Sequence, residues 1–148
     1  MERHITDEEL GHLVFWPDGL YDGPAVRAVF RRVRRYIDFD GTIAYGAGCV
    51  AVTTLRGRPL AEFLSEEEYV VHTHGIGAAQ FFEQRFPLLP KPTLMFFPPF
   101  FRYIGPKFPD DNHHGGKDFA ALDITGAVII DDLPPYRIHA PGCLILPP

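Results

Sequence analysis

Two histidines at alternate positions mark the segment of this chain whose residues most clearly suggest a chemical function. The stretch YVVHTHGIG, residues 69–77, places His72 and His74 at the end of an apolar run that glycine follows at once. Side chains alternate between the two faces of a β-strand, so a strand here points both imidazoles to the same side, about 6–7 Å apart. Zinc is the expected metal, because its catalytic sites take three ligands from His, Asp, Glu or Cys and leave one position for water.

The surrounding pattern predicts an α+β fold, with a mixed β-sheet flanked by helices. Asp22 and Pro24 suit the start of an amphipathic helix that continues to about Ile37. TIAYGAGCVAVTTL and EYVVHTH have the β-branched content of strands, AAQFFEQRF favours a helix, and the end of the chain is typical of a hairpin. With 148 residues and 46% hydrophobic content, residues 1–148 are expected to form a single domain.

The segment at about 88–110 combines many prolines with many aromatic residues. Prolines disfavour a regular helix or a central strand, so a long loop is expected. Such a loop is either a lid or binding segment beside a site, or a loop packed on the core of the domain.

Charge and composition limit the partners and the location. The net charge of −5 and the pI of about 5.7 disfavour a nucleic-acid partner. The segment MERHITDEELGH lacks the pattern of a secretory signal, and the apolar runs are too short for a membrane span. We therefore expect a cytoplasmic protein, or a domain delivered as part of a larger secreted effector. Cys49 and Cys143 are expected to be free thiols.

The order of these elements and motifs resembles the JAB/JAMM (MPN) metalloprotease domain, in the branch found as toxin-like domains of bacterial polymorphic and RHS proteins. VVHTHG matches the His-x-His element of that family. FAALD matches its Phe-Ser-x-x-Asp element, with Phe119 in place, Ala120 at the serine and Asp123 at the aspartate. AYGAG places Ala44 where the family has its general-base glutamate. The resemblance implies a layered architecture like that of cytidine deaminases.

The resemblance also implies a function, a zinc-dependent hydrolase of peptide or isopeptide bonds in a bacterial toxin or effector. Its metal ligands would be His72, His74 and Asp123, and its partners would be a peptide or protein substrate and an immunity or chaperone protein. The connection between His74 and Asp123 is longer than in the family, which makes residues 88–110 an insertion beside the site. Other metal-competent side chains in the same connection are His113, His114 and Asp118.

Alanine has no proton acceptor, so Ala44 predicts metal binding without efficient turnover. Three explanations stay open: a pseudoenzyme, an inactivating Glu-to-Ala change, or another carboxylate such as Asp38 or Asp40 acting as the base.

Three other functions compete with this one. A cysteine hydrolase would use Cys49 with His72 or His74, although Cys49 stands in an apolar stretch that favours an inert thiol. A metal-dependent nuclease would use the DDNHHGG run, against the acidic charge of the chain. A non-enzymatic binding module would dock a protein partner on residues 88–110.

Overall fold

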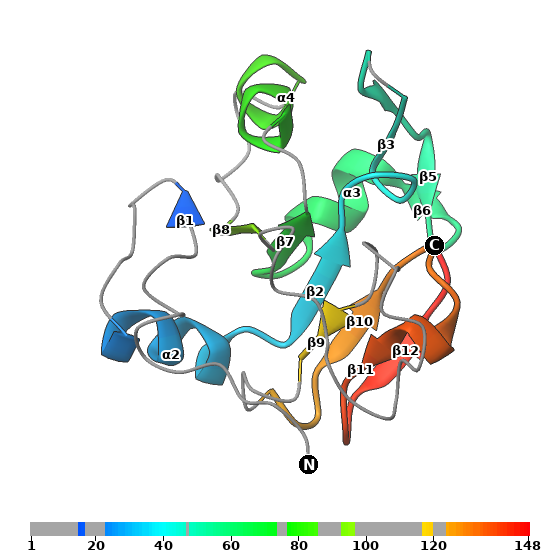
Figure 1. Ribbon diagram of the computed structural model, residues 1–148. Coiled ribbons are helices and arrows are strands. Elements are labelled where there is room, and N and C mark those ends of the chain that lie inside the picture. Colours follow the sequence, from blue (N-terminus) through cyan, green and yellow to red (C-terminus); the bar gives the residue numbers. More distant parts are fainter. Residues whose placement is uncertain are drawn as a thin grey trace.

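The computed structural model describes residues 15–16, 23–46, 48–73, 77–85, 93–96, 117–119 and 124–148. These residues are built around a six-stranded β-sheet (Figure 1). In spatial order its strands are β1 (Phe15–Trp16), β8 (Thr93–Phe96), β7 (Val70–Thr73), β2 (Arg35–Asp38), β10 (Val128–Ile130) and β12 (Leu144–Leu146).

Five strands of this sheet run parallel, and β1 pairs antiparallel with β8 at one edge. Starting from β2, the chain first adds β7 and β8 on one side and later adds β10 and β12 on the other. The strand order therefore reverses between β2 and β10. In open α/β sheets, ligands bind outside the carboxyl ends of the strands at such a switch point.

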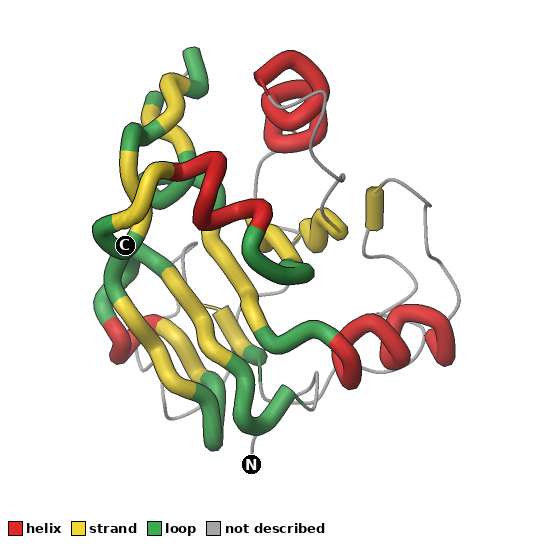
Figure 2. The backbone as a smooth tube through the Cα atoms, turned by 180° about the vertical axis from the view of Figure 1, so that it is seen from behind, coloured by secondary structure: helices red, strands yellow, loops and turns green. Residues whose placement is uncertain are grey.

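Smaller elements surround the sheet. Three strand pairs are β3 (Ala44–Tyr45) with β4 (Val50–Ala51), β5 (Thr54–Leu55) with β6 (Arg58–Pro59), and β9 (Lys117–Asp118) with β11 (Ile138–His139). The helices are α2 (Gly23–Arg32), α3 (Leu60–Ser65), α4 (Gly77–Arg85) and the short 3-10 helix η2 (Pro135–Arg137). Among the described helices, none is long and apolar enough to cross a membrane. Figures 1 and 2 show α4 and the β3–β4 hairpin beyond the carboxyl ends of β2 and β7, whereas α2 lies near their amino ends.

Both faces of the central strands β2 and β7 are buried. Neighbouring residues on β2 alternate between two apolar clusters, since Tyr36 packs in one and Ile37 in the other. Val70 and Val71 on β7 divide in the same way. β2 and β7 are buried along their whole length, as expected for strands of a parallel sheet that is covered on both faces.

The helix predicted to reach about Ile37 ends at Arg32, and the residues after it form β2 instead. Apolar residues at helical spacing across a short run do not distinguish a helix from a buried strand. Arg35, which falls within that predicted helix, is buried on β2. Its guanidinium donates a hydrogen bond to the carbonyl of Phe63 (2.9 Å) and pairs with Glu67 (3.1 Å).

The proline-rich segment contains a strand of the central sheet, contrary to expectation. β8 occupies Thr93–Phe96 and pairs with β7 on one side and β1 on the other. Pro92 and Pro98 flank these four residues, so no proline interrupts the ladder. The rest of residues 88–110 lies outside the described part of the chain. The lid or binding role expected of this segment therefore stays a prediction.

The closing hairpin is also a wrong prediction. β12 runs parallel to β10, and β11 leaves the sheet to pair with β9. Turn residues do separate β10, β11 and β12, but turn residues do not specify which strands pair. At the coarser level the expected α+β class with a mixed sheet agrees with the fold, which is mixed α/β with a mainly parallel sheet.

Candidate functional site

Polar side chains end three neighbouring strands at the same edge of the sheet. Asp38 is the last residue of β2, Thr73 is the last residue of β7, and Asp131 directly follows β10. Asp38 also lies in register with His72 on β7. The parallel pairing therefore gathers these side chains at the switch point of the sheet.

A lysine from a distant part of the chain joins them. The ammonium nitrogen of Lys117 lies 2.8 Å from Oδ1 of Asp38 and 2.7 Å from Oδ2 of Asp131. It also lies 3.0 Å from Nδ1 of His72. Lys117 belongs to β9, which its parallel pairing with β11 holds in place. We call Asp38, His72, Lys117 and Asp131 the buried cluster.

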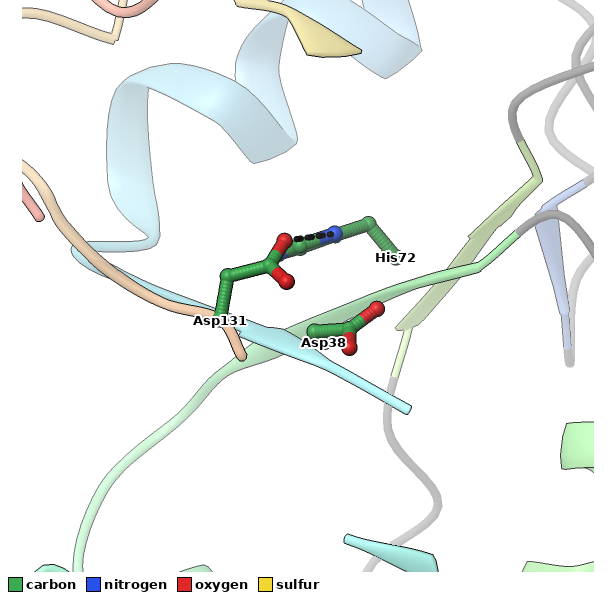
Figure 3. A group of neighbouring side chains, drawn as sticks. All are labelled: Asp38, His72 and Asp131. Carbon is green, nitrogen blue, oxygen red and sulfur yellow. Dashed lines mark ion pairs between the residues drawn. The ribbon is translucent and has the colours of Figure 1, made fainter. Parts of the chain in front are cut away.

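All four side chains are removed from solvent. Asp38 is 5% exposed, Lys117 and Asp131 are 2% exposed, and His72 is fully buried. Figure 3 shows the side chains of Asp38, His72 and Asp131 pointing toward one another from three strand ends. Nδ1 of His72 and Oδ2 of Asp131 are 4.0 Å apart, too far for a hydrogen bond.

The charges of the cluster do not cancel, since two carboxylates face one lysine. Burial is the main cause that raises the pKa of Asp38 to about 8, and the nearby carboxylates of Asp131 and Asp132 raise it further. The charge and hydrogen bond of Lys117 act in the opposite direction. A buried site with this imbalance gains free energy by taking up a proton or a further cation.

Asp132 supplies a third carboxylate next to Asp38. Its side chain fills the space in which a Cβ atom on Gly41 would stand, and Gly41 has a φ of +82°, which disfavours other residues. The glycine after Asp40 therefore lets Asp132 approach the end of β2. Thr42 donates a hydrogen bond from Oγ1 to Oδ2 of Asp38 (3.2 Å), so the other oxygen of this carboxylate is also oriented.

Asp40 differs from Asp38 by being exposed to solvent. It lies two residues beyond Asp38, in the turn where the N–H of Gly41 donates to the carbonyl of Ala44 (2.8 Å). The hydroxyl of Thr73 donates to Oδ2 of Asp40 (3.2 Å). The end of β2 and the turn after it thus carry one buried and one exposed carboxylate, each held by a threonine hydroxyl.

Metal binding fits these residues in two ways. Ligand atoms of Asp38, His72 and Asp131 all lie within 4.8 Å of one another and could hold a metal ion. An ion at the centre of those three would displace the ammonium of Lys117, which contacts each of them. A cation held by Asp38 and Asp132 would leave Lys117 in place. A carboxylate pair suits Mg²⁺, whereas a set with imidazole suits zinc.

The residues predicted from sequence are found only in part. His72 belongs to the buried cluster, and so does Asp38, one of the two carboxylates considered as a substitute base. Ala44 is buried on β3. The other expected ligands and alternatives lie outside the described residues: His74, His113, His114, Ala120 and Asp123.

Two further predicted residues lie in defined positions. Asp118 is on β9, in register with His139 of β11. Cys49 is half-buried in the turn between β3 and β4, not within a strand, and has a φ of +48°. Both described cysteines are free thiols, as expected.

Sequence reasoning missed Lys117, Asp131 and Asp132. The available signal was the recurrence of an apolar run followed by aspartate, in YIDFD and again in VIIDD. When two such runs are parallel neighbours, their aspartates meet at one edge of the sheet.

Comparison with known proteins gives no relative from which a function could be transferred. No family model, curated protein or solved structure matches this chain. The function is therefore argued from the geometry of the site.

Proposed function

We propose that this protein is a metal-dependent phosphohydrolase that transfers the phosphoryl group of a phosphate monoester to Asp38 and then to water. The observation that supports it best is the Asp38 carboxylate at the switch point of the sheet, with Lys117 on one oxygen and Asp40 two residues further on. Aspartate carboxylates are known nucleophiles toward phosphorus, through an aspartyl-phosphate intermediate.

A fixed cation beside the nucleophile suits a phosphate substrate. Phosphoryl transfer is catalysed mainly by positioning and by charge stabilisation around the transferred group. Lys117 provides one fixed cation that touches the nucleophile itself. Asp38 and Asp132 would hold a divalent metal ion, which when bound would neutralise charge on the phosphate oxygens.

Two carboxylates with different exposure can divide the chemical work. An oxygen of Asp38 forms the new bond to phosphorus while the bond from phosphorus to the ester oxygen breaks. Asp40, exposed and held by Thr73, gives its proton to that leaving oxygen. Asp40 then takes a proton from the water that hydrolyses the acyl phosphate, which releases orthophosphate and restores both carboxyl groups.

The test is hydrolysis of p-nitrophenyl phosphate and a panel of monoesters with Mg²⁺ or Mn²⁺. Wild type is expected to turn over, Asp38→Asn to lose turnover and covalent labelling, and Asp40→Asn to slow turnover by about 10²–10⁴-fold, the usual contribution of a general acid or base. Glu66→Gln, an exposed substitution on the same scaffold, is the matched control. Acid quenching with a radiolabelled monoester should trap phosphate on the wild-type chain. If no monoester is turned over and no label is trapped, the proposal is wrong.

A zinc-dependent hydrolase of peptide or isopeptide bonds is the second candidate. The observation that favours it is the group of Asp38, His72 and Asp131, which includes one of the predicted zinc ligands. The JAB/JAMM-like arrangement, the protein substrate and the toxin or effector context all belong to this candidate.

Metal content distinguishes the two candidates. About one zinc per chain after purification without chelator, lost in His72→Ala/His74→Ala, together with cleavage of a peptide or isopeptide panel, would support the hydrolase. Protein without tightly bound zinc that hydrolyses monoesters when Mg²⁺ is added would support the phosphohydrolase instead.

A further inference from the structure

His72 belongs to the buried cluster but has none of the roles proposed so far, which are nucleophile, general acid and carboxylate ligand of a metal ion. It is fully buried on β7, in register with Asp38, and its ring lies edge-on to Phe119 with centroids 5.1 Å apart. A polar ring at this depth needs a hydrogen-bond partner to offset its lost hydration. The ammonium nitrogen of Lys117 lies 3.0 Å from its Nδ1.

The chemistry of that contact fixes the form of the ring. A lysine ammonium has three donors and no acceptor, so Nδ1 must accept the hydrogen bond and carry no proton. The same ammonium lies 2.8 and 2.7 Å from carboxylate oxygens of Asp38 and Asp131. The contact therefore assigns to Nδ1 of His72 the role of acceptor.

We infer that His72 is a positioning residue, a neutral acceptor that holds the ammonium of Lys117 against the attacking carboxylate, and that it is not a metal ligand. The inference rests in part on the proposed phosphohydrolase activity. An ammonium has three hydrogens, and here three acceptors use them: Asp38, Asp131 and His72. Removing one acceptor frees the lysine to rotate away from Asp38, because its long side chain has several rotatable bonds.

Asparagine and leucine variants separate this role from simple packing. The amide oxygen of asparagine can take the place of Nδ1, whereas leucine fills similar space without an acceptor. We expect His72→Leu to lower kcat for p-nitrophenyl phosphate by about 10–100-fold, the usual loss when an orienting partner is removed. KM should change little, and His72→Asn should recover most of kcat. Equal activity in the two variants, at equal thermal stability, would overturn the inference.

Nuclear magnetic resonance tests the inference independently of enzyme turnover. Long-range nitrogen–proton spectra of the wild-type imidazole should show a protonated Nε2 and an unprotonated Nδ1 at neutral pH. A protonated Nδ1, or an imidazolium, would overturn the inference even if the enzyme is active. If no monoester is hydrolysed but the expected ring form is observed, the proposed function fails while the lysine contact stands.

Discussion

Replacing Lys117 by methionine tests whether the buried cluster is held together by charge. Methionine keeps an apolar side chain of similar length but removes the ammonium that contacts Asp38 and Asp131. Both carboxylates would then face each other without a cation, and both are nearly inaccessible to water.

The size of the effect follows from this burial. Removing one partner of a buried ion pair costs about 3–5 kcal/mol, because an uncompensated charge is left in a poorly solvated place. The stability of a whole domain is about 5–15 kcal/mol, so the variant should lose a large share of it. At this chain length the loss corresponds to a fall of roughly 6–20 °C in Tm.

The pH dependence of the loss carries the sharper test. Burial already raises the pKa of Asp38 to about 8 in the wild type, and loss of Lys117 raises it further. A raised acidic pKa gives stability that is present at low pH and is lost as the pH rises through the folded-state pKa. Asp38 is protonated at pH 5 in both proteins, so the destabilisation by Lys117→Met should be larger at pH 9 than at pH 5.

Urea unfolding followed by circular dichroism at the two pH values measures this directly. Lys117→Met/Asp131→Asn is the matched control, because it removes one of the two carboxylates left without a cation and should recover about 2 kcal/mol or more at pH 9. The reasoning would be refuted if Lys117→Met cost less than about 1 kcal/mol at pH 9, or the same amount at both pH values.

Three further outcomes follow from the same site. The pKa of about 8 for Asp38 exceeds its unfolded value, so metal-free wild type should lose thermal stability as the pH rises from about 4 to 8, and Asp38→Asn should lose less. Adding Mg²⁺ to 100 times its wild-type Kd should stabilise wild type against unfolding by about 2.7 kcal/mol. The same concentration should stabilise Asp132→Asn less, and an equal gain would show that Asp132 is not a metal ligand. Gly41→Ala should be more destabilising than Gly57→Ala in thermal melts. Both glycines have a positive φ, but only at Gly41 would the new methyl meet the Asp132 carboxylate, so equal losses would contradict that contact.

Local elements were the part of this fold that sequence could predict. The strand in EYVVHTH, the helix in AAQFFEQRF and the short strands around the glycines of residues 42–55 are all confirmed. Each is specified by its own apolar pattern and by the turn residues beside it. β2 was missed because its four residues continue the helical spacing of the preceding segment.

Strand order and the site required information that no local pattern holds. His72 was recognised because its neighbour at i+2 is a second histidine, yet its described partner Lys117 is 45 residues away. Asp38 and Asp131 meet because β2 and β10 pair in parallel, and such pairing is not readable from either strand alone. Gly41 acquires its role from a carboxylate in the last quarter of the chain.

The two-residue strand β9 gives the molecule an order of assembly. It carries Lys117 to Asp38 across 79 positions of sequence and is held by a ladder of only two residues with β11. The pairing of β2 with β10 spans a longer separation, but the buried apolar core of the sheet supports it, whereas the lysine contact depends on loop closure and on a ladder of two residues. We expect the sheet to form with its aspartates still hydrated, and the lysine to dock last. A chain arrested before that step would have a native sheet but no reactive centre, so chemical competence would mark the completion of folding.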